Sequence, residues 1–298
     1  MFHVEHFVYL ILQKINVPRG TFAKGVDILY VFCYNPCIMF NRGLKMGKVI
    51  AFANQKGGIG KTTSAINTAA AVAAMGYKVL LVDCDPQGNT TSGVNINKKG
   101  LANSTYDVMI GNCSAETAIR HTEYKNLDIL PTNIDLAGAE FELVALEDRA
   151  FRLKNALDTV KEKYDYTFID CPPSLGILTI DCLTAADGVI IPMQCEYFAL
   201  EGLSQLMVTI RKIKGLYNPE LQIVGIIITM YNGRLNLSLQ VLGELKKYYV
   251  DKIFKEPIPR SVRLSEAPSY GMPIEYYDRM SKGAEAYRAI AKELITRI

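Results

Sequence analysis

One stretch of the chain, KVIAFANQKGGIGKTTS at residues 48–64, constrains the fold more than any other. Residues 48–53 are mostly apolar, which is typical of a strand that is buried on both faces of a parallel sheet. Residues 64–75 are rich in alanine and contain no proline, which predicts a helix. Because three glycines lie between these segments, the stretch predicts a strand, a tight turn and a helix.

The glycine-rich turn predicts a phosphate-binding site. Gly57, Gly58 and Gly60 allow successive backbone N–H groups and the helix N-terminus to converge on one anion. In a loop of this kind we expect Lys61 to reach the β- and γ-phosphates of a nucleotide and the Thr62 hydroxyl to bind Mg²⁺. An ordinary strand-to-helix connection is the alternative, but Gly-Lys-Thr directly after a strand favours the P-loop.

A second lysine precedes the glycines, and KGGIGKTT at residues 56–63 resembles the deviant Walker A motif of the ParA/MinD ATPases. The resemblance implies that the nucleotide is ATP, bound with Mg²⁺. It also implies that Lys56 reaches across a dimer interface to the nucleotide of the partner subunit. A solvated loop lysine is the alternative interpretation of Lys56. The loop residues expected to bind the nucleotide are Lys56, Gly57, Gly58, Ile59, Gly60, Lys61, Thr62 and Thr63.

Composition fits one large α/β core, because the chain has 298 residues, is 49% hydrophobic and has no low-complexity linker. No apolar run reaches the roughly 18 residues of a membrane span, and seven scattered cysteines favour a reducing compartment, so we expect a cytoplasmic protein. Residues 1–45 hold five basic and two acidic side chains, which leaves 28 of each from the totals of 33 and 30. Nucleic-acid binding would therefore need a local basic patch.

Residues 1–45 lack clean periodicity, and we expect them to be an N-terminal extension of a domain at residues 46–298, either disordered or translated from upstream DNA. A secretory signal is excluded by the missing basic start and the polar interruptions. A zinc site is a further interpretation, although the spacing of its ligands matches no known zinc finger. Its ligands would be His3, His6, Cys33 and Cys37.

The first six residues support the interpretation that residues 1–45 are translated from upstream DNA and that Met46 is the natural start. They can be spelled ATG TTC CAC GTG GAA CAT, which contains the palindrome TGTTCCACGTGGAACA, and two-fold DNA sites serve two-fold proteins. The palindrome closely resembles the centromere-like site bound by ParB, the partner of ParA. We hypothesise that these residues are a ParB site read as protein, and any other codon spelling in the gene would exclude this.

Two further predicted strands end in carboxylates, which places them at the edge where doubly wound sheets bind ligands. KVLLVD ends at Asp83 and YTFID ends at Asp170. By resemblance, the DPQGN sequence that follows Asp83 is the first switch loop, in which Asp85 orients or activates the attacking water. Asp83 would then hold the Mg²⁺ shell and Asp170 would be the Walker B aspartate. An Asx-type turn at Asp85 and helix capping by Asp170 are the alternatives.

Two loops near the C-terminus carry arginines. TMYNGR at residues 229–234 and IPRSVRLSEAPS at residues 258–269 resemble loops of the ParA/Soj proteins. The resemblance implies that Arg234 and Arg263 contact DNA and that Pro259 borders the adenine. Solvated surface arginines are the alternative. His121 has no evident acid or nucleophile partner nearby in sequence, and we expect it on the surface.

Periodicity and composition predict the remaining elements. Helices are expected at residues 106–110, 135–146, 151–164, 195–216 and 283–298, and strands at residues 127–130, 188–194 and 221–230.

The resemblance covers residues 46–298, with the motifs in the same order, and the chain is identified as a member of the ParA/Soj partitioning ATPases. This implies a doubly wound, mostly parallel P-loop sheet, an ATP-dependent homodimer, binding to DNA without sequence preference, a nucleoid-associated location and hydrolysis stimulated by a ParB-type partner. A MinD-like membrane regulator is the main alternative, but the tail AYRAIAKELITRI lacks a basic amphipathic anchor, so we expect no stable membrane association. A metabolic P-loop enzyme would need a substrate pocket or paired cluster cysteines.

Overall fold

A computed structural model describes residues 47–298 of the chain. The predictions for residues 1–45, which include the extension, the zinc ligands and the ParB-site spelling, lie outside this range, as does the proposed start at Met46.

A seven-stranded sheet in the order β3-β4-β2-β5-β1-β6-β7 forms the centre of the protein. Every neighbouring pair is parallel except β3 with β4. The doubly wound, mostly parallel sheet predicted from the sequence is therefore confirmed. The strands are β1 (Lys48–Phe52), β2 (Val79–Asp83), β3 (Arg120–His121), β4 (Leu127–Leu130), β5 (Tyr166–Asp170), β6 (Gly188–Gln194) and β7 (Gln222–Thr229).

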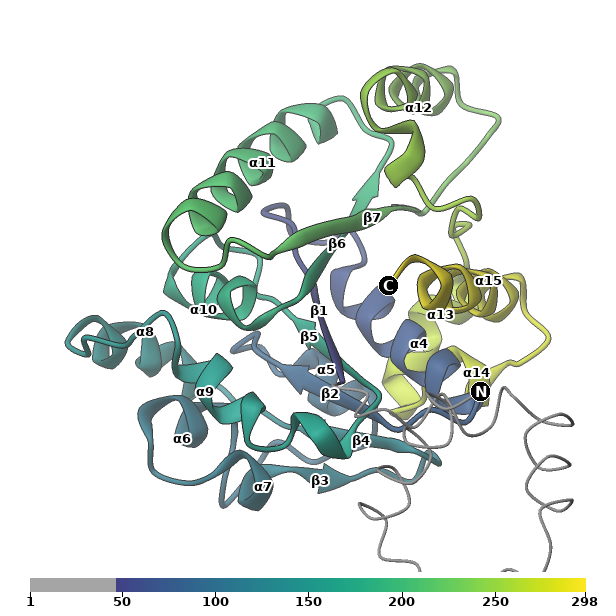
Figure 1. Ribbon diagram of the computed structural model, residues 1–298. Helices are drawn as coiled ribbons and strands as arrows, with labels where there is room; N and C mark the ends of the chain where they lie inside the picture. Colours follow the sequence, from purple (N-terminus) through teal and green to yellow (C-terminus); the bar gives the residue numbers. More distant parts are fainter. Residues whose placement is uncertain (1–46) are drawn as a thin grey trace, which may run out of the picture. The chain divides into compact units, whose positions relative to one another are not determined.

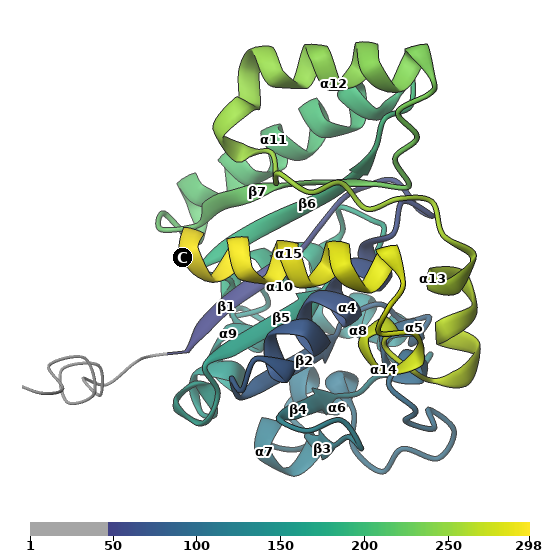
Figure 2. The ribbon, with the colours of Figure 1, turned by 90° about the vertical axis from the view of Figure 1, so that its right-hand side faces the viewer.

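Helices cover both faces of the sheet (Figure 1, Figure 2). One face is packed by α4 (Lys61–Ala74), α13 (Val262–Glu266), α14 (Ile274–Tyr277) and α15 (Lys282–Arg297). The other face is packed by α6 (Thr105–Ile110), α7 (Ala115–Ala118), α9 (Arg152–Asp158), α10 (Ile177–Ala185), α11 (Ala199–Leu216) and α12 (Asn236–Tyr249). The short helices α5 (Asn89–Gly93) and α8 (Leu136–Val144) and the 3-10 turns η1 (Lys161–Lys163), η2 (Val250–Lys252) and η3 (Ala267–Tyr270) complete the described part.

The alternating side chains of the central strand explain these two layers. In β1, Val49 and Ala51 belong to the core cluster on one face, whereas Ile50 and Phe52 belong to the cluster on the other. All four are almost fully buried, as expected for a strand of a parallel sheet that is covered on both sides. The small side chains of the alanine-rich helix α4 let it pack closely on the sheet, and α15 packs against α4.

Several local features differ from the sequence predictions, and the helices α5, α7, α10, α13 and α14 were not among the predicted elements. The helix expected at residues 151–164 ends at Asp158, and the chain continues as a 3-10 turn. The sequence predicted neither the two-residue strand β3 nor the helix α12. His121 is exposed as predicted, but it has an acid partner, because its Nδ1 lies 2.8 Å from Oδ1 of Asp128 on the neighbouring strand.

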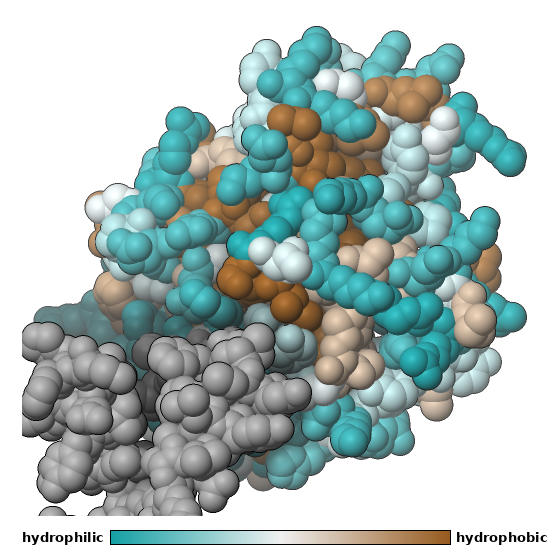
Figure 3. Space-filling view, turned by 45° about the vertical axis from the view of Figure 1, so that its right-hand side comes forward, coloured by the Kyte–Doolittle hydropathy of each residue, from teal (hydrophilic) through white to brown (hydrophobic). Residues whose placement is uncertain are grey.

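Hydrophobic residues are not confined to the core. On the face shown in Figure 3 they gather in the upper and central part (brown), between hydrophilic residues (teal). Exposed apolar side chains on or next to α12 include Leu237, Leu239 and Val250. Within residues 47–298, no helix combines the length and the apolar character needed to cross a membrane.

Candidate nucleotide and DNA site

The glycine-rich loop between β1 and α4 lies at the carboxyl ends of the central strands. Gly58 and Gly60 have φ of 72° and 85°, a left-handed conformation that strains residues with a side chain. Neighbouring strands hold the loop in place: Thr229 donates its hydroxyl to the Ile59 carbonyl at 2.7 Å, and Gln194 donates Nε2 to the Gly58 carbonyl at 3.1 Å. The loop is therefore built on the strand ends, with the first backbone N–H groups of α4 directly behind it.

Lys61 is the first residue of α4 and is only 6% exposed. It is close enough to Asp170 for its charge to oppose, in part, the rise in the pKa of that carboxyl group that burial causes. A buried lysine at the start of a helix would repel other cations and attract an anion that is bound by the loop. Its position therefore fits the phosphate contact predicted from the sequence.

The two predicted strand-end carboxylates are neighbours in the sheet. Asp83 and Asp170 are paired residues of β2 and β5, and both are fully buried. Burial, together with the charge of Asp170, raises the pKa of Asp83 to about 7. Burial also raises the pKa of Asp170 to about 6, although hydrogen bonds from Thr90 and Thr62 oppose the shift.

Each carboxylate is oriented by a threonine hydroxyl that the sequence prediction did not include. Thr90 donates to Oδ2 of Asp170 at 2.7 Å, and Thr91 donates to Oδ2 of Asp83 at 2.7 Å through its hydroxyl and at 2.8 Å through its backbone N–H. Both threonines are in α5, the helix that follows the DPQG sequence. Two adjacent hydroxyl residues so close to that loop were the feature of the sequence that could have indicated them as site residues.

The oxygen atoms around Asp170 fit a magnesium ion. Its Oδ2 accepts a hydrogen bond from the Thr62 hydroxyl at 2.7 Å, whereas its buried Oδ1 has no hydrogen-bond partner among the described residues. No group of three His, Cys, Asp or Glu residues within residues 47–298 could hold a metal alone. Mg²⁺ does not need such a group, because it commonly uses one or two protein oxygens together with phosphate and water. Thr62 and Asp170 would hold the ion directly or through water, with Asp83 behind them.

Asp85 forms the Asx-type turn that was the structural alternative, and its position still suits the predicted role. Its Oδ1 accepts from the backbone N–H of Gln87 at 3.0 Å, and its carbonyl accepts from that of Gly88 at 2.8 Å. The side chain is 8% exposed, and its charge raises the pKa of Asp170. Asp85 is therefore a fixed carboxylate next to the predicted metal site, with one oxygen available to a water molecule.

Lys56 forms an ion pair within its own subunit. Its Nζ contacts Oε2 of Glu196, in the segment between β6 and α11, and both side chains are about half exposed. An exposed pair of this kind is weak and is readily exchanged for a phosphate. The sequence did not predict this contact, because the two residues are 140 positions apart.

Pro259 lines a cavity of about 310 Å³ next to the glycine-rich loop. Gly60 and Thr63 form the loop side of this cavity, and Leu264 and Pro268 provide apolar surface. A cavity with apolar walls beside the phosphate loop has the chemistry that a purine base requires. That Pro259 borders the adenine stays a prediction, for which this cavity provides the space.

The structure brings the two predicted DNA-contacting loops together. Tyr231 donates its backbone N–H to the Ile258 carbonyl at 2.8 Å and forms an isolated bridge with Pro259. Arg234 is exposed, and its side chain has no partner among the described residues. Arg263 is also exposed, but its guanidinium lies 3.2 Å from Glu266 and 3.4 Å from Asp278.

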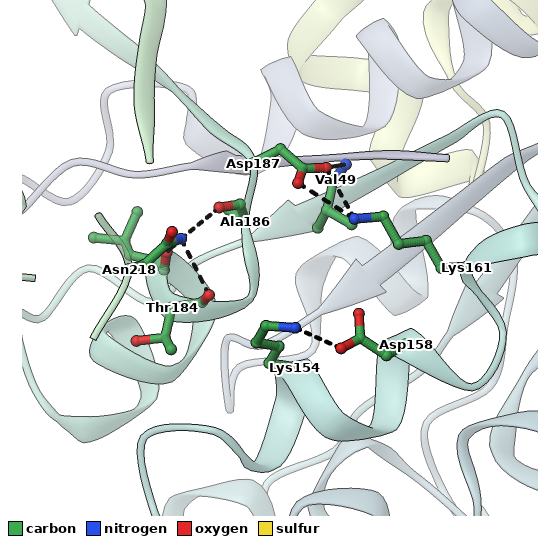
Figure 4. Close-up of polar contacts among 9 residues, drawn as sticks. Val49, Lys154, Asp158, Lys161, Thr184, Ala186, Asp187 and Asn218 are labelled. Atoms are coloured by element: carbon green, nitrogen blue, oxygen red, sulfur yellow. Dashed lines mark hydrogen bonds and ion pairs between the residues drawn. The ribbon is translucent and has the colours of Figure 1, made fainter. Parts of the chain in front are cut away.

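A larger cavity, of about 600 Å³, lies at the opposite edge of the sheet, near the amino ends of β1, β6 and β7. Figure 4 shows the polar contacts around it. Asp187 accepts from the Val49 backbone N–H at 2.8 Å and pairs with Lys161 at 3.2 Å. Asn218 donates to the Ala186 carbonyl at 2.7 Å and to the Thr184 carbonyl at 3.1 Å. These groups satisfy one another, and none of the predicted site residues lies here.

The sequence of this chain is similar to those of known proteins. A family model described as an AAA domain matches residues 47–223. The chain is 54% identical over 249 residues to the sporulation initiation inhibitor protein Soj of Bacillus subtilis, covering 84% of this chain and 98% of that protein. It is 47% identical over 252 residues to the chromosome partitioning protein ParA of Caulobacter vibrioides, covering 84% and 94%.

A solved structure is also similar to this chain. Cobyrinic acid a,c-diamide synthase from Mycobacterium smegmatis, with bound ATP analog and magnesium, is 39% identical. It superimposes with a TM-score of 0.76 over 84% of this chain and 94% of that one.

The parallel sheet, the glycine-rich loop at its carboxyl edge and the buried lysine at the start of α4 define a P-loop ATPase. Together with the matches to Soj and ParA, they show that the chain belongs to the ParA/Soj family of chromosome-partitioning ATPases.

Proposed function

We propose that this protein is a nucleotide switch that binds ATP with Mg²⁺ in the glycine-rich loop. The observation that carries the proposal is the group formed by Lys61, Thr62 and Asp170, in which one buried carboxylate oxygen still lacks a partner. Loop N–H groups and Lys61 would hold the phosphates, and the cavity beside Pro259 would hold the base. Magnesium would neutralise phosphate charge at this site.

Hydrolysis would depend on Asp85. The residue is fixed by its turn next to the predicted metal site, and a carboxylate there can accept a hydrogen bond from a water molecule and orient it toward the γ-phosphate. Because the phosphates are held by other groups, Asp85 would contribute to cleavage more than to binding.

ATP would also control association. Two ATP-bound subunits would close face to face, and Lys56 of each would exchange Glu196 for the nucleotide of its partner. Closure would double the cationic surface that includes Arg234, so that it can bind DNA phosphates without reading sequence. A ParB-type protein would stimulate hydrolysis and dissolve the dimer, as the resemblance to the partitioning ATPases implies.

Two other functions make different predictions. A MinD-like regulator would bind lipid in the presence of ATP, whereas the partitioning function requires DNA. The M. smegmatis structure is named as a synthase, and in a metabolic enzyme of that kind ATP hydrolysis would depend on a small-molecule substrate.

The test is purified protein with ATP, ADP or no nucleotide, incubated separately with plasmid DNA and with anionic liposomes. We expect binding to DNA with ATP alone, a dimer in size-exclusion chromatography, and no flotation with liposomes. Lys56→Ala should bind ATP as a monomer and form no dimer. Flotation without DNA binding would support the membrane regulator, and an equal loss of ATP affinity in Lys56→Ala and Lys61→Ala would show that Lys56 acts within its own subunit.

A further inference from the structure

Almost every arginine side chain in residues 47–298 is bound to another part of the protein. Two are not: the guanidinium groups of Arg234 and Arg260 have neither a hydrogen bond nor an ion pair with any described residue. The arginines with a carboxylate or carbonyl partner are Arg120, Arg149, Arg152, Arg211, Arg263, Arg279, Arg288 and Arg297.

The two unpartnered arginines lie on loops that are joined to each other. The backbone bridge from Tyr231 to Ile258 and Pro259 connects the chain just before Arg234 with the chain just before Arg260. Both arginines are exposed, and Arg260 also lines the cavity that adjoins the glycine-rich loop. The two loops that carry the unpartnered arginines are therefore joined, and Arg260 lies beside the site where the nucleotide is expected.

Arg263, which the sequence suggested as the second DNA contact, is in a different electrostatic position. Glu266 and Asp278 are both within 3.4 Å of its guanidinium, and Tyr277 donates its hydroxyl to the same Glu266. A phosphate approaching Arg263 would meet two carboxylates and would have to displace at least one of them. Arg260 pays no such penalty, because it has no internal partner to lose.

We propose that Arg260 contacts DNA phosphates together with Arg234, and that it is a DNA-binding residue in addition to those that the sequence indicated. The proposal rests on the proposed function. The N–H donors of a guanidinium lie in one plane and can bind two oxygens of the same phosphate. In an exposed guanidinium without an internal partner, all of these donors are available to a phosphate. A phosphate of the bound nucleotide is the alternative ligand for Arg260, because Arg260 lines the cavity where the nucleotide is expected.

The experiment compares Arg260→Ala, Arg260→Lys and the control Arg149→Ala with the unaltered full-length protein. DNA binding is measured with ATP as a function of salt, and affinity for a fluorescent ATP analogue is measured without DNA. Arg149 is a suitable control because it is exposed, bonds only to the Val144 carbonyl and lies outside both loops.

For Arg260→Ala we expect DNA affinity to fall by about three-fold or more on every sequence, and the salt slope to fall by about 1 for each arginine removed. Arg260→Lys, which keeps the charge, should retain part of the affinity, and ATP affinity should stay within about two-fold in all variants. Unchanged DNA binding in Arg260→Ala, or a loss of ATP affinity with DNA binding intact, would overturn this inference alone. No ATP-dependent DNA binding by the unaltered protein would overturn the proposed function as well.

Discussion

The amino and carboxyl edges of the sheet differ in how their charged groups are satisfied. At the amino edge lies the larger cavity, and two of its lysines are paired with carboxylates there, Lys161 with Asp187 and Lys154 with Asp158. At the carboxyl edge the cavity beside Pro259 is about half as large, but a buried oxygen of Asp170 and the guanidinium groups of two exposed arginines have no partner within residues 47–298.

The difference indicates that the proposed nucleotide site follows the unpartnered polar groups and not the size of the cavity. A cavity whose polar groups already satisfy one another has little to offer a charged ligand, because binding would have to break those contacts. Unpartnered groups at the ends of parallel strands gain a partner when a ligand binds. The comparison therefore supports the proposed nucleotide site at the carboxyl edge and a structural role for the amino edge.

The largest effect is expected at the carboxyl edge, from Lys61→Ala. The substitution removes a buried charge that would contact the phosphates, and a charge-assisted contact of about 3 kcal/mol corresponds to about 100-fold in affinity. Isothermal titration with ATP and Mg²⁺ measures the loss. Lys154→Ala at the amino edge is the control and should bind ATP normally, so an equal loss in both variants would contradict the comparison.

Asp85→Ala should separate holding ATP from cleaving it. The loop amides, Lys61 and Thr62 remain, so ATP binding and the dimer should persist, whereas loss of the positioned water should slow hydrolysis by about 100-fold or more. Size-exclusion chromatography with ATP, followed by phosphate release, measures both properties. Near-normal turnover would mean that the Asx-type turn is the only role of Asp85.

At the amino edge, Asp187→Ala should lower stability without changing ATP affinity. It leaves the buried Val49 N–H without its acceptor and the largely buried Lys161 without its ion-pair partner, which together cost about 2 to 4 kcal/mol. Urea unfolding measures the cost, and Asp187→Asn, which keeps an acceptor for Val49, should lose less. A stable Asp187→Ala variant with impaired ATP binding would place a ligand function at this edge.

The smallest effect concerns Asp181, whose buried Oδ2 also lacks a partner but which lies on α10, away from the glycine-rich loop. Burial raises the pKa of Asp181 to about 8, from an ordinary value near 3.8, so the folded protein keeps a proton that the unfolded chain releases. The stability contributed by the protonated group is complete below about pH 3.8 and is lost as the pH rises to about 8.

Asp181→Asn removes this titration while keeping an acceptor for the Leu153 N–H, which is now 3.1 Å from Oδ1. The melting temperature of the variant should therefore fall less between pH 5 and pH 8, by a few degrees. Parallel melting curves for the two proteins would contradict the pKa assignment. The result would also distinguish the two buried carboxylates that have an unpartnered oxygen. Asp181 would hold a proton on its carboxyl group, whereas Asp170 has Lys61 and Thr62 as neighbours.

The sequence was sufficient for the features that follow from local pattern. The glycine loop, Asp83 and Asp170 were predicted because each lies at the carboxyl end of a strand, and parallel strands bring such positions to one edge. Contacts that depend on how separate loops meet were not predictable. Glu196 is far from Lys56 in the chain, and the free side chain of Arg260 becomes significant only once the partners of the other arginines are known.

Local pattern was also insufficient where an element is short or depends on its surroundings. β3 has two residues, which is too few for alternation to be recognised, and it exists because it pairs with β4. The helix expected to continue to residue 164 stops at Asp158, because the chain must turn there to enter β5.

The two outermost strands limit how copies of this protein can associate. β3 offers a neighbour only two residues, Arg120 and His121, and charged, short edge strands discourage pairing between molecules. Beyond β7, backbone hydrogen bonds from Phe254 and Ile258 to Ile226 and Ile228 occupy the other border. A continuous intermolecular sheet, with its risk of open-ended aggregation, is thus disfavoured, so the proposed ATP-dependent dimer would have to form through loops and helices.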